Sequence, residues 1–578
     1  MATYDVVIRG GSLIDGTGAT ARSADIGIRA DRIVQIGNID SSGEREIDAA
    51  GRVVAPGFVD IHTHYDAQVF WDGMLSPSPY HGVTSVVGGN CGFSIAPLSA
   101  EAADYLVHML ARVEGMPLES LLAGVPWNWR SFGEYLARID GKVAVNAGFM
   151  VGHSALRRVV MGERAVGERA TDAELAAMVE LLRRSLGEGG LGFSSTISIS
   201  HNDADGRPVP SRHASREELI ALARAVRDYP GTTLEFLPGV EPFDEERMAL
   251  MTDLSLAARR PLNWNALGVT ADNGDYVRQQ LGASDYARER GARVVALTTP
   301  QSGGLRVNFV SGFVLDMLPG WDALFRLPLA ERRRELSDPA GRRRLQEGAA
   351  IGLPGPMSDL SRFDRIEIRE TFAPANARFQ GRTCGDVAAE LGKPALDVML
   401  DVALADDLRT SFLLHIGSSA GGTPADWQAR GRVWADERVL IGASDAGAHL
   451  DMIDSFAIPT RVLANGVREH RLLGLEQAVH LLTDRPARLI GLRERGRIAP
   501  GWKADVVVFD PATVDCEPVH TRADLPGGGS RLYAGAAGIC HVLVNGVEIV
   551  RDGADTGARP GTVLRSGRDT ETVEVGAR

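Results

Sequence analysis

Two histidines separated by one residue lie in the segment FVDIHTHYD, residues 58–66. Successive side chains of an extended strand point to opposite faces, so His62 and His64 project from the same face. Imidazole is the commonest metal ligand, and such a pair supplies half of a metal site. The alternative is one satisfied core histidine and one solvated histidine. The paired spacing at the end of an apolar run favours a metal site, which needs further ligands.

Three more residues follow other apolar runs and are candidates to complete this site. Cys91, in GGNCGF, offers a soft thiolate that suits zinc, although most free cysteines are small buried hydrophobes. Asp445, in IGASDAGAHLD, can hold a metal, take a proton from metal-bound water, or cap the next helix. Glu235, in TTLEF, is an acid inside an apolar segment and needs a partner there.

The elements that must position these residues alternate between strands and helices. Helices are predicted at 171–187 and 215–228, where Thr171 with Glu174 and Ser215 with Glu218 form capping-box patterns. Eight strand-like runs interleave with such helices: GFVDIHTH, VTSVVGG, VAVNAGFMVG, GLGFSST, GTTLEF, RPLNWNAL, ARVVALT and RVLIGAS. This alternation predicts an α/β protein with a (β/α)8 TIM-like barrel over 57–490, in which catalytic groups gather at the strands' C-terminal ends.

The two chain ends carry short strands broken by glycine, at 1–56 and again at 491–578. Neither end has enough strand to bury a core alone, so we expect both to pair into one small discontinuous β-sandwich. An Asn545-Gly546 dipeptide predicts a tight hairpin in the second half. Residues 300–436, between the seventh and eighth strands, are far longer than a usual connection and predict a lid or substrate-binding subdomain.

The composition excludes several classes of function. The 75 acidic and 62 basic residues give a net charge of −13 without a basic stripe, so nucleic-acid binding is not expected. The four cysteines form no disulfide framework, and neither a signal peptide nor an apolar run of membrane-spanning length is evident. We therefore expect a soluble cytoplasmic protein with a small-molecule substrate and no membrane partner. The sequence leaves the oligomeric state open.

Several segments together resemble one enzyme family. The stretches VVAPGFVDIHTH, HGVTSVVGGNCGFSIAPL, GHSALRRVVMG, SDAGAHLD and RGRIAPGWKADVVVFDP are similar to the amidohydrolase superfamily, and within it to N-acyl-D-amino-acid deacylases, or D-aminoacylases. The resemblance implies that His62, His64 and Asp445 bind a labile metal. It also implies that Cys91 holds a tight zinc with two further histidines, at the ends of the fifth and sixth strands.

Those two further histidines are absent. The fifth strand offers Glu235 or Phe236, depending on register, and the sixth offers Asn263 or Asn265. A carboxylate can replace imidazole as a ligand, but a neutral amide binds zinc poorly. We therefore expect one Zn²⁺ per chain, held by the four implied residues, with Glu235 as a possible fifth ligand.

The reaction that this resemblance implies is hydrolysis of an N-acyl-D-amino acid, a carbon–nitrogen bond other than a peptide bond, with Asp445 as general base and acid. The candidates for binding substrate are His153, Arg157, Arg306 and His449. His201 and His213, in the loop after the fourth strand, are predicted to lie on the surface. The alternatives are another amide substrate, such as a cyclic imide or small peptide, and a non-catalytic scaffold.

Overall fold

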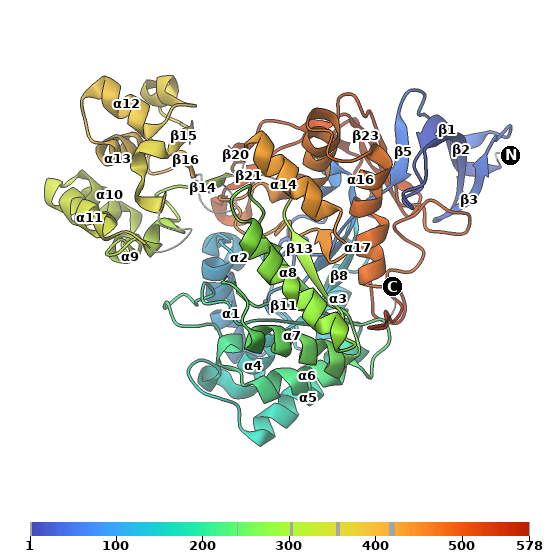
Figure 1. Cartoon of the computed structure of the whole chain (residues 1–578), viewed down its shortest axis with the longest axis horizontal. Coiled ribbons are helices and arrows are strands. Elements are labelled where there is room, and N and C mark those ends of the chain that lie inside the picture. The colour runs from blue at the N-terminus through green and yellow to red at the C-terminus, as the bar shows by residue number, and fades with distance from the viewer. Residues whose placement is uncertain (1–2, 240, 301–303, 354–358, 415–421, 577–578) are drawn as a thin grey trace.

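Parallel strands surrounded by helices form the centre of the molecule in the computed structural model, which describes residues 3–239, 241–300, 304–353, 359–414 and 422–576 (Figure 1). Two parallel sheets have the strand orders β6-β7-β8 and β9-β10-β11-β12-β13-β17. Their bounds are β6 Phe58–Asp60, β7 Val83–Gly88, β8 Asn146–Phe149, β9 Val151–Gly152, β10 Gly192–Thr196, β11 Thr233–Leu237, β12 Leu262–Leu267, β13 Val294–Thr298 and β17 Val439–Ile441. Each of the eight predicted runs contains one of these strands, except that β11 extends one residue beyond its run, and the third contains both β8 and β9.

Two details connect the sheets. Only Met150 separates β8 from β9, and its amide donates to Gly88 O at 2.9 Å. At the other margin, Thr63 and Ala446 form a parallel bridge just beyond the ends of β6 and β17. Because the strands run parallel, their carboxyl ends meet at one edge, where the candidate ligands follow β6, β7 and β17.

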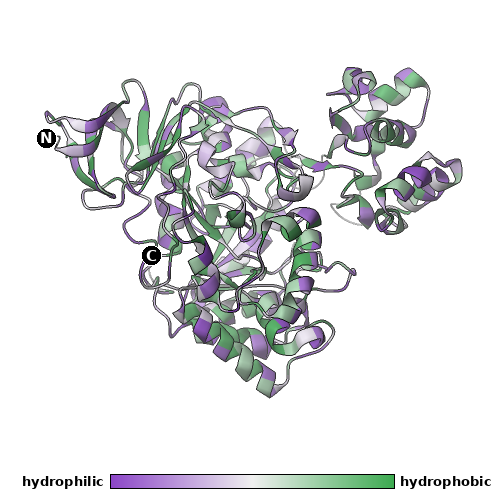
Figure 2. Cartoon of the chain, turned by 180° about the vertical axis from the view of Figure 1, so that it is seen from behind, coloured by the Kyte–Doolittle hydropathy of each residue, from purple (hydrophilic) through white to green (hydrophobic). Residues whose placement is uncertain are grey.

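Helices cover these strands on the outside. Figure 2 shows green hydrophobic residues on the inner strands and both hydrophilic and hydrophobic residues on the outer helices. The helices of this part are α1 Ala100–Val113, α2 Leu118–Gly124, α3 Phe132–Ile139, α4 His153–Met161, α5 Asp172–Gly187, α6 Arg216–Val226, α7 Glu245–Ala258, α8 Gly274–Glu289, α14 Pro424–Trp434, α15 Ile458–Arg461, α16 Leu475–Leu482 and α17 Asp484–Leu489.

The two predicted capping boxes have different outcomes. On α5, Thr171 accepts from the Glu174 amide and the Glu174 side chain returns to the cap, which confirms the prediction. On α6, Ser215 accepts from the Glu218 amide, but the Glu218 carboxylate turns inward to His153. The capping box on α6 is therefore incomplete, because the Glu218 carboxylate contacts the buried His153 ring instead of the helix cap.

Strands from both chain ends meet in one nine-stranded sheet, in which β5 pairs antiparallel with β18. Its strands are β1 Tyr4–Leu13, β2 Arg22–Arg29, β3 Arg32–Gly37, β4 Gly43–Asp48, β5 Val53–Pro56, β18 Val506–Phe509, β23 Ile539–Val544, β24 Val547–Arg551 and β25 Ala554–Asp555. Asn545 and Gly546 both have positive φ between β23 and β24, which confirms the predicted hairpin.

Other parts of the predicted C-terminal unit lie away from this sheet. Val563 forms a bridge with Ala147 of β8, and the Thr570 hydroxyl donates to Gly231 O at 2.6 Å. The expectation that all of 491–578 joins the end sheet therefore needs correction, because the apolar Val563 is buried against the central strands. Two short strand pairs lie between β18 and β23 in the chain. They are β19 Asp515–Cys516 with β22 Ala536–Ala537, and β20 His520–Arg522 with β21 Arg531–Tyr533.

The long insertion forms a lobe that extends to the side of the molecule (Figure 1). Its elements are β14 Leu305–Val307, α9 Asp322–Phe325, α10 Leu329–Ser337, α11 Pro339–Ile351, β15 Glu367–Glu370, α12 Cys384–Leu391, α13 Ala395–Ala405 and β16 Ser411–Leu414. The lobe has a hydrophobic core of its own around Trp321 and Phe412. By contrast, Trp427 and Trp434 of α14 belong to the main core, so the lobe ends before α14 rather than at residue 436. Within the described residues, no helix has the length and apolar character needed to cross a membrane.

Candidate metal centre

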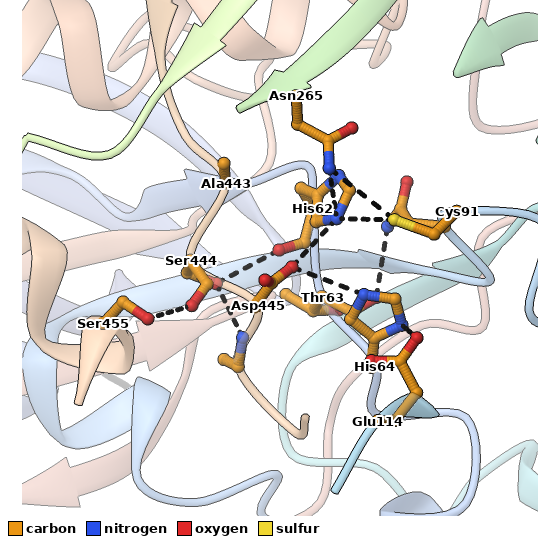
Figure 3. Close-up of polar contacts among 12 residues, drawn as sticks. His62, Thr63, His64, Cys91, Glu114, Asn265, Ala443, Ser444, Asp445 and Ser455 are labelled. Atoms are coloured by element: carbon orange, nitrogen blue, oxygen red, sulfur yellow. Dashed lines mark hydrogen bonds and ion pairs between the residues drawn. The ribbon is translucent and has the colours of Figure 1, made fainter. Parts of the chain in front are cut away.

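The histidine pair and Asp445 converge at the carboxyl ends of the central strands (Figure 3). The Asp445 Oδ1 atom lies 3.0 Å from His62 Nε2 and 3.4 Å from His64 Nε2. Cys91 Sγ lies 3.6 Å from the same nitrogen of His62. The donor atoms of His62, His64 and Cys91 all lie within 4.8 Å of one another, which makes them a candidate metal cluster. The structure thus brings together the four residues implied by the family resemblance.

Asp445 is the most accessible of these four groups. Its side chain is 32% exposed, whereas His62 and His64 are 0% and 2% exposed. Its backbone is left-handed, with φ +51°, and its amide donates to His62 O at 3.2 Å. Such strained conformations of residues other than glycine concentrate at functional sites. The exposed carboxylate can therefore meet both the buried donors and an incoming substrate.

Glu235 lies behind the donor cluster rather than within it. Its Oε2 atom accepts a hydrogen bond from the Cys91 amide at 2.7 Å, and its Oε1 lies 4.0 Å from His62 Nδ1. This is the ring nitrogen opposite the one that faces Asp445. Burial raises the pKa of Glu235 to about 8. Glu235 thus bonds to the Cys91 backbone, while its Oε1 is buried near His62 without a hydrogen-bond partner, and its role as a fifth ligand stays a prediction.

Glu114 has the equivalent position behind His64. Its Oε1 atom lies 3.4 Å from His64 Nδ1, and its side chain is 3% exposed. Carboxylates that contact the outer nitrogen of a metal-binding histidine fix its tautomer and orientation. Sequence reasoning missed Glu114 because it follows helix α1 rather than a strand end, and no motif includes it.

Asn265, on β12, contacts the donor cluster. Its Nδ2 atom lies 3.3 Å from His62 Nε2 and 3.6 Å from Cys91 Sγ, while its Oδ1 is buried without a partner. Of the residues considered at the two altered strands, Glu235 and Asn265 are the ones whose side chains contact the cluster. The amide touches the donor cluster, a contact that the sequence pattern did not predict.

Charges around the cluster are strongly interdependent. Burial opposes a charge on His64, yet the neighbouring Glu114 and Asp445 carboxylates raise its pKa to about 9. Burial also opposes ionisation of Asp445, but hydrogen bonds from His62 and His64 hold its pKa well below the ordinary value. Burial raises the pKa of the Cys91 thiol well above the ordinary value. A cation at the cluster would stabilise the thiolate, as zinc does when thiols coordinate it.

The donor set fits zinc on chemical grounds. Two imidazole nitrogens, one thiol sulfur and one carboxylate oxygen are the ligand types that zinc accepts in proteins. Magnesium and calcium prefer oxygen ligands alone. The residues present therefore suit a zinc ion held by His62, His64, Cys91 and Asp445.

His153 and Arg157, two of the proposed substrate-binding residues, have partners elsewhere. The His153 ring contacts Ser195 Oγ at 2.8 Å and Glu218 Oε1 at 2.9 Å. Arg157 donates to both oxygens of Glu218, at 2.6 and 2.7 Å. Both side chains are fully buried. Their substrate-binding role is therefore corrected: they form a buried network against α6.

Arg306 also lies away from the donor cluster. It donates to Val519 O at 3.1 Å and lies 3.7 Å from Glu370 Oε2, at the base of the lobe. Its side chain is 5% exposed. The expectation that it binds substrate is corrected, because its contacts join the lobe to the C-terminal segment.

His449 does lie beside the cluster. Its amide donates to Glu114 O at 2.5 Å, its ring lies 5.3 Å from that of Phe313 in the insertion, and its Nδ1 is buried without a partner. His201 has a similarly unpartnered Nδ1, and its ring lies 4.9 Å from that of Phe93. Burial lowers the pKa of His201 to about 3, with the nearby charges of His449 and His64 adding to the effect. The His201 side chain as a whole is partly buried, so it lies between the predicted surface position and the interior.

His213 is the remaining histidine of that loop. Its Nε2 atom lies 3.3 Å from Pro208 O, a contact within its own loop, and its ring is partly buried. His213 and His201 are thus both partly buried, and the charges of His449 and His64 lower only the pKa of His201.

Comparison with known proteins gives a consistent set of relatives. The chain matches the amidohydrolase family model over residues 45–314 and 361–550. It is 29% identical to D-aminoacylase of Alcaligenes xylosoxydans xylosoxydans over 577 residues, covering 97% of each chain. It is 30% identical to N-acyl-D-glutamate deacylase of the same organism, covering 97% of this chain and 96% of the relative.

Two solved structures are similar over the same length. A D-aminoacylase studied for its binuclear metal center has a TM-score of 0.64 at 28% identity, covering 97% of this chain and 100% of the other. N-acyl-D-glutamate deacylase of Bordetella bronchiseptica, complexed with zinc and a phosphonate inhibitor, has a TM-score of 0.63 at 27% identity with the same coverage.

Proposed function

The chain belongs to the amidohydrolase family, and from this premise we propose that it hydrolyses N-acyl-D-amino acids to a carboxylate and a free D-amino acid. The observation that carries the proposal is the convergence of His62 Nε2, His64 Nε2, Cys91 Sγ and Asp445 Oδ1. The substrate class is supported by relatives named D-aminoacylase and N-acyl-D-glutamate deacylase, each similar over nearly the full chain.

One zinc ion per chain is part of the proposal. When bound, the ion would lower the pKa of a water molecule and polarise the scissile carbonyl. His62, His64, Cys91 and Asp445 would hold it. The ligand set for a second ion lacks the two further histidines of the resemblance, because the fifth and sixth strands carry no histidine and present Glu235 and Asn265 near the cluster instead.

Asp445 would transfer the proton. Hydrogen bonds from His62 and His64 hold its pKa well below the ordinary value, so the carboxylate is ionised. If the imidazoles held a metal in place of these hydrogen bonds, the carboxylate would be a stronger base and could accept a proton from the attacking water. It would then return that proton to the leaving nitrogen, since an amine leaves poorly as an anion. Its 32% exposed side chain is accessible to the substrate, and His449, with an unpartnered Nδ1, is the proposed polar contact beside it.

The architecture that we infer around this site is a closed (β/α)8 barrel with a β-sandwich formed by the two chain ends. The one-residue gap between β8 and β9 and the Thr63–Ala446 bridge support closure of the barrel. The shared nine-stranded sheet and its apolar cluster support the joint end unit. We further propose that the lobe's first segment borders the site, since Phe313 contacts the His449 ring.

The test is turnover of matched N-acetyl-D- and N-acetyl-L-amino acids by the full chain, with zinc supplied and then removed by a chelator. We expect zinc-dependent release of the free D-amino acid. Release of only the L-amino acid would contradict the stereochemistry. If the chain binds zinc but hydrolyses neither the N-acetyl-D- nor the N-acetyl-L-amino acids, its substrate is another amide. If it neither binds zinc nor hydrolyses an amide, it is a scaffold.

A further inference from the structure

The loop that carries Cys91 has an unusual backbone. It follows β7 in the sequence GGNCGF, and Cys91 itself is left-handed with φ +55°. This conformation is unfavourable for residues other than glycine and persists only where the surroundings impose it. Contacts outside the loop must therefore hold Cys91 in this orientation, and the Glu235 carboxylate, which accepts from the Cys91 amide at 2.7 Å, is one of them.

The glycines beside Cys91 let the loop lie tightly against neighbouring strands. Gly89 has φ +72°, and a Cβ atom there would lie 2.3 Å from Met150 O. Gly92 has φ +77°, and its Cβ would lie 3.1 Å from Ser195 Cα of β10. The close approach brings the loop's peptide groups within hydrogen-bonding distance of side chains on those elements.

Ser194, on β10, bridges the two sides of the loop. Its hydroxyl accepts a hydrogen bond from the Gly92 amide at 3.0 Å and donates one to Gly89 O at 2.5 Å. Ser194 is fully buried, so water cannot readily replace it. One hydroxyl thus joins the peptide groups on both sides of Cys91.

Asp66 holds the same loop from the side of the histidine pair. Its Oδ2 atom accepts from the Gly89 amide at 2.8 Å, and the side chain is 3% exposed. Asp66 lies two residues after His64, so this bond connects the histidine segment directly to the cysteine loop. With Ser194, it engages both the N–H and the C=O of Gly89.

We propose that Ser194 and Asp66 are positioning residues for Cys91, which hold the loop so that its sulfur completes the metal site. Neither side chain coordinates the ion. Without the Ser194 hydroxyl, the Gly92 N–H and Gly89 C=O lose this buried partner, and the loop relaxes toward ordinary backbone angles. The Cys91 sulfur then moves away from the other donors. The inference rests on the proposed zinc centre.

Ser195 provides a matched control within the same strand. Successive side chains of a strand point to opposite faces, and the Ser195 hydroxyl contacts His153 Nδ1 at 2.8 Å instead of the loop. Ser194→Ala and Ser195→Ala each remove one buried hydroxyl from β10. Effects of general destabilisation therefore appear in both variants, and loss of Cys91 positioning appears only in the first.

The experiment measures zinc affinity by chelator competition and the thiolate-to-metal charge-transfer band of the cobalt(II) protein. Ser194→Ala should bind zinc about 10–100-fold more weakly and lose much of the band, whereas Ser195→Ala should retain both. Equal affinity and equal bands in the two variants would overturn the proposal. If neither the native chain nor Ser195→Ala binds zinc or shows the band, the proposed zinc centre fails first.

A second pair of variants keeps the test decisive if Ser194→Ala is not recovered folded. Asp66→Asn retains an oxygen that can accept from the Gly89 amide, whereas Asp66→Ala removes it. We expect weaker zinc binding and a weaker cobalt band for Asp66→Ala than for Asp66→Asn. Indistinguishable variants with native affinity would overturn the role of Asp66 and of the loop contacts.

Discussion

Each histidine of the candidate centre has one nitrogen directed inward and one directed toward a carboxylate. The Nε2 atoms of His62 and His64 face Asp445, while Glu235 and Glu114 lie behind their Nδ1 atoms. An outer carboxylate fixes the tautomer and makes the inner nitrogen a stronger ligand. Here neither Nδ1 atom has a hydrogen-bond partner among the described residues, so the two carboxylates act on the histidines through their charge and position.

Glu114→Gln tests this dependence. The amide keeps an oxygen near His64 Nδ1 but removes the negative charge, so we expect zinc affinity to fall about 10–100-fold. Zinc affinity is measured by chelator competition. The control is Glu119→Gln, an exposed acid on α2. Native zinc affinity in Glu114→Gln would mean that the carboxylate only fills space.

Asp445→Asn tests proton transfer. The amide cannot accept the proton of the attacking water, so kcat should fall by at least about 100-fold while the fold is retained. Zinc content is measured alongside turnover, and loss of metal would identify Asp445 as mainly a ligand. Asp451→Asn, in the same loop, is the control because Asp451 is bonded to Asn308 Nδ2. Near-normal turnover of Asp445→Asn would contradict its role as base.

Sequence reasoning could single out the four proposed ligands, which lie close together in the structure, because each of them follows a strand. His62, His64, Cys91 and Asp445 lie in short motifs whose spacing reflects the local backbone. Glu114 could not be found in this way, since it reaches His64 only through the packing of the segment after α1. For the same reason, the contacts of Arg306 and His153 could not be predicted, because their partners lie far away in the sequence.

At the level of elements, local patterns predicted strands and helix starts better than long-range partners. The α5 capping box formed as predicted, but on α6 the Glu218 carboxylate is used by a buried network with His153 and Arg157. A capping pattern cannot reveal that competing partner. Similarly, the length of the insertion predicted a separate unit, but only packing shows that α14 belongs to the main core.

The lobe should unfold as a unit distinct from the main body. Trp321 is fully buried there, stacks on Phe363 at 5.8 Å between ring centroids, and donates to Leu345 O. Trp321→Ala should destabilise the lobe by about 3–5 kcal/mol and produce an earlier transition in calorimetry, with unchanged zinc affinity. Trp434→Ala, in the main core, should instead lower the main transition. A single shared transition shifted equally by both variants would contradict an independent lobe.

At the scale of the whole molecule, segments from both chain ends contact the central strands. The end sheet joins β5 to β18, and Val563, which follows β25, forms a bridge with Ala147 of β8. The segment around β21 also reaches the site's side of the molecule: Arg531 donates to Ser76 O at 2.7 Å, and the Leu532 amide donates to Leu450 O at 2.6 Å. Compositional patterns could predict that the ends pair, but not these individual contacts.

Removing zinc should change how the stability of the whole chain depends on pH. Without metal, the folded protein keeps a proton on His64 up to a pKa of about 9, compared with an ordinary value of 6.5. Glu235 likewise keeps its proton up to about 8, compared with 4.5. Between the ordinary pKa of each group and its pKa in the folded state, the folded chain binds more protons than the unfolded chain. Folding stability therefore falls as the pH rises. For both groups the contribution to folding stability is fully present below the ordinary pKa. It is lost as the pH rises through the pKa of the folded state.

The zinc-free chain should therefore show a thermal midpoint that falls from pH 6.5 to pH 9, the window set by His64. Bound zinc takes the place of the His64 proton, and metal binding that releases protons becomes more favourable at higher pH. The difference in midpoint between zinc-loaded and zinc-free protein should thus widen over the same window. Differential scanning calorimetry of both forms checks this, with His108→Asn as the control because His108 is 42% exposed. A constant or narrowing difference would contradict both the raised pKa of His64 and its coordination of zinc.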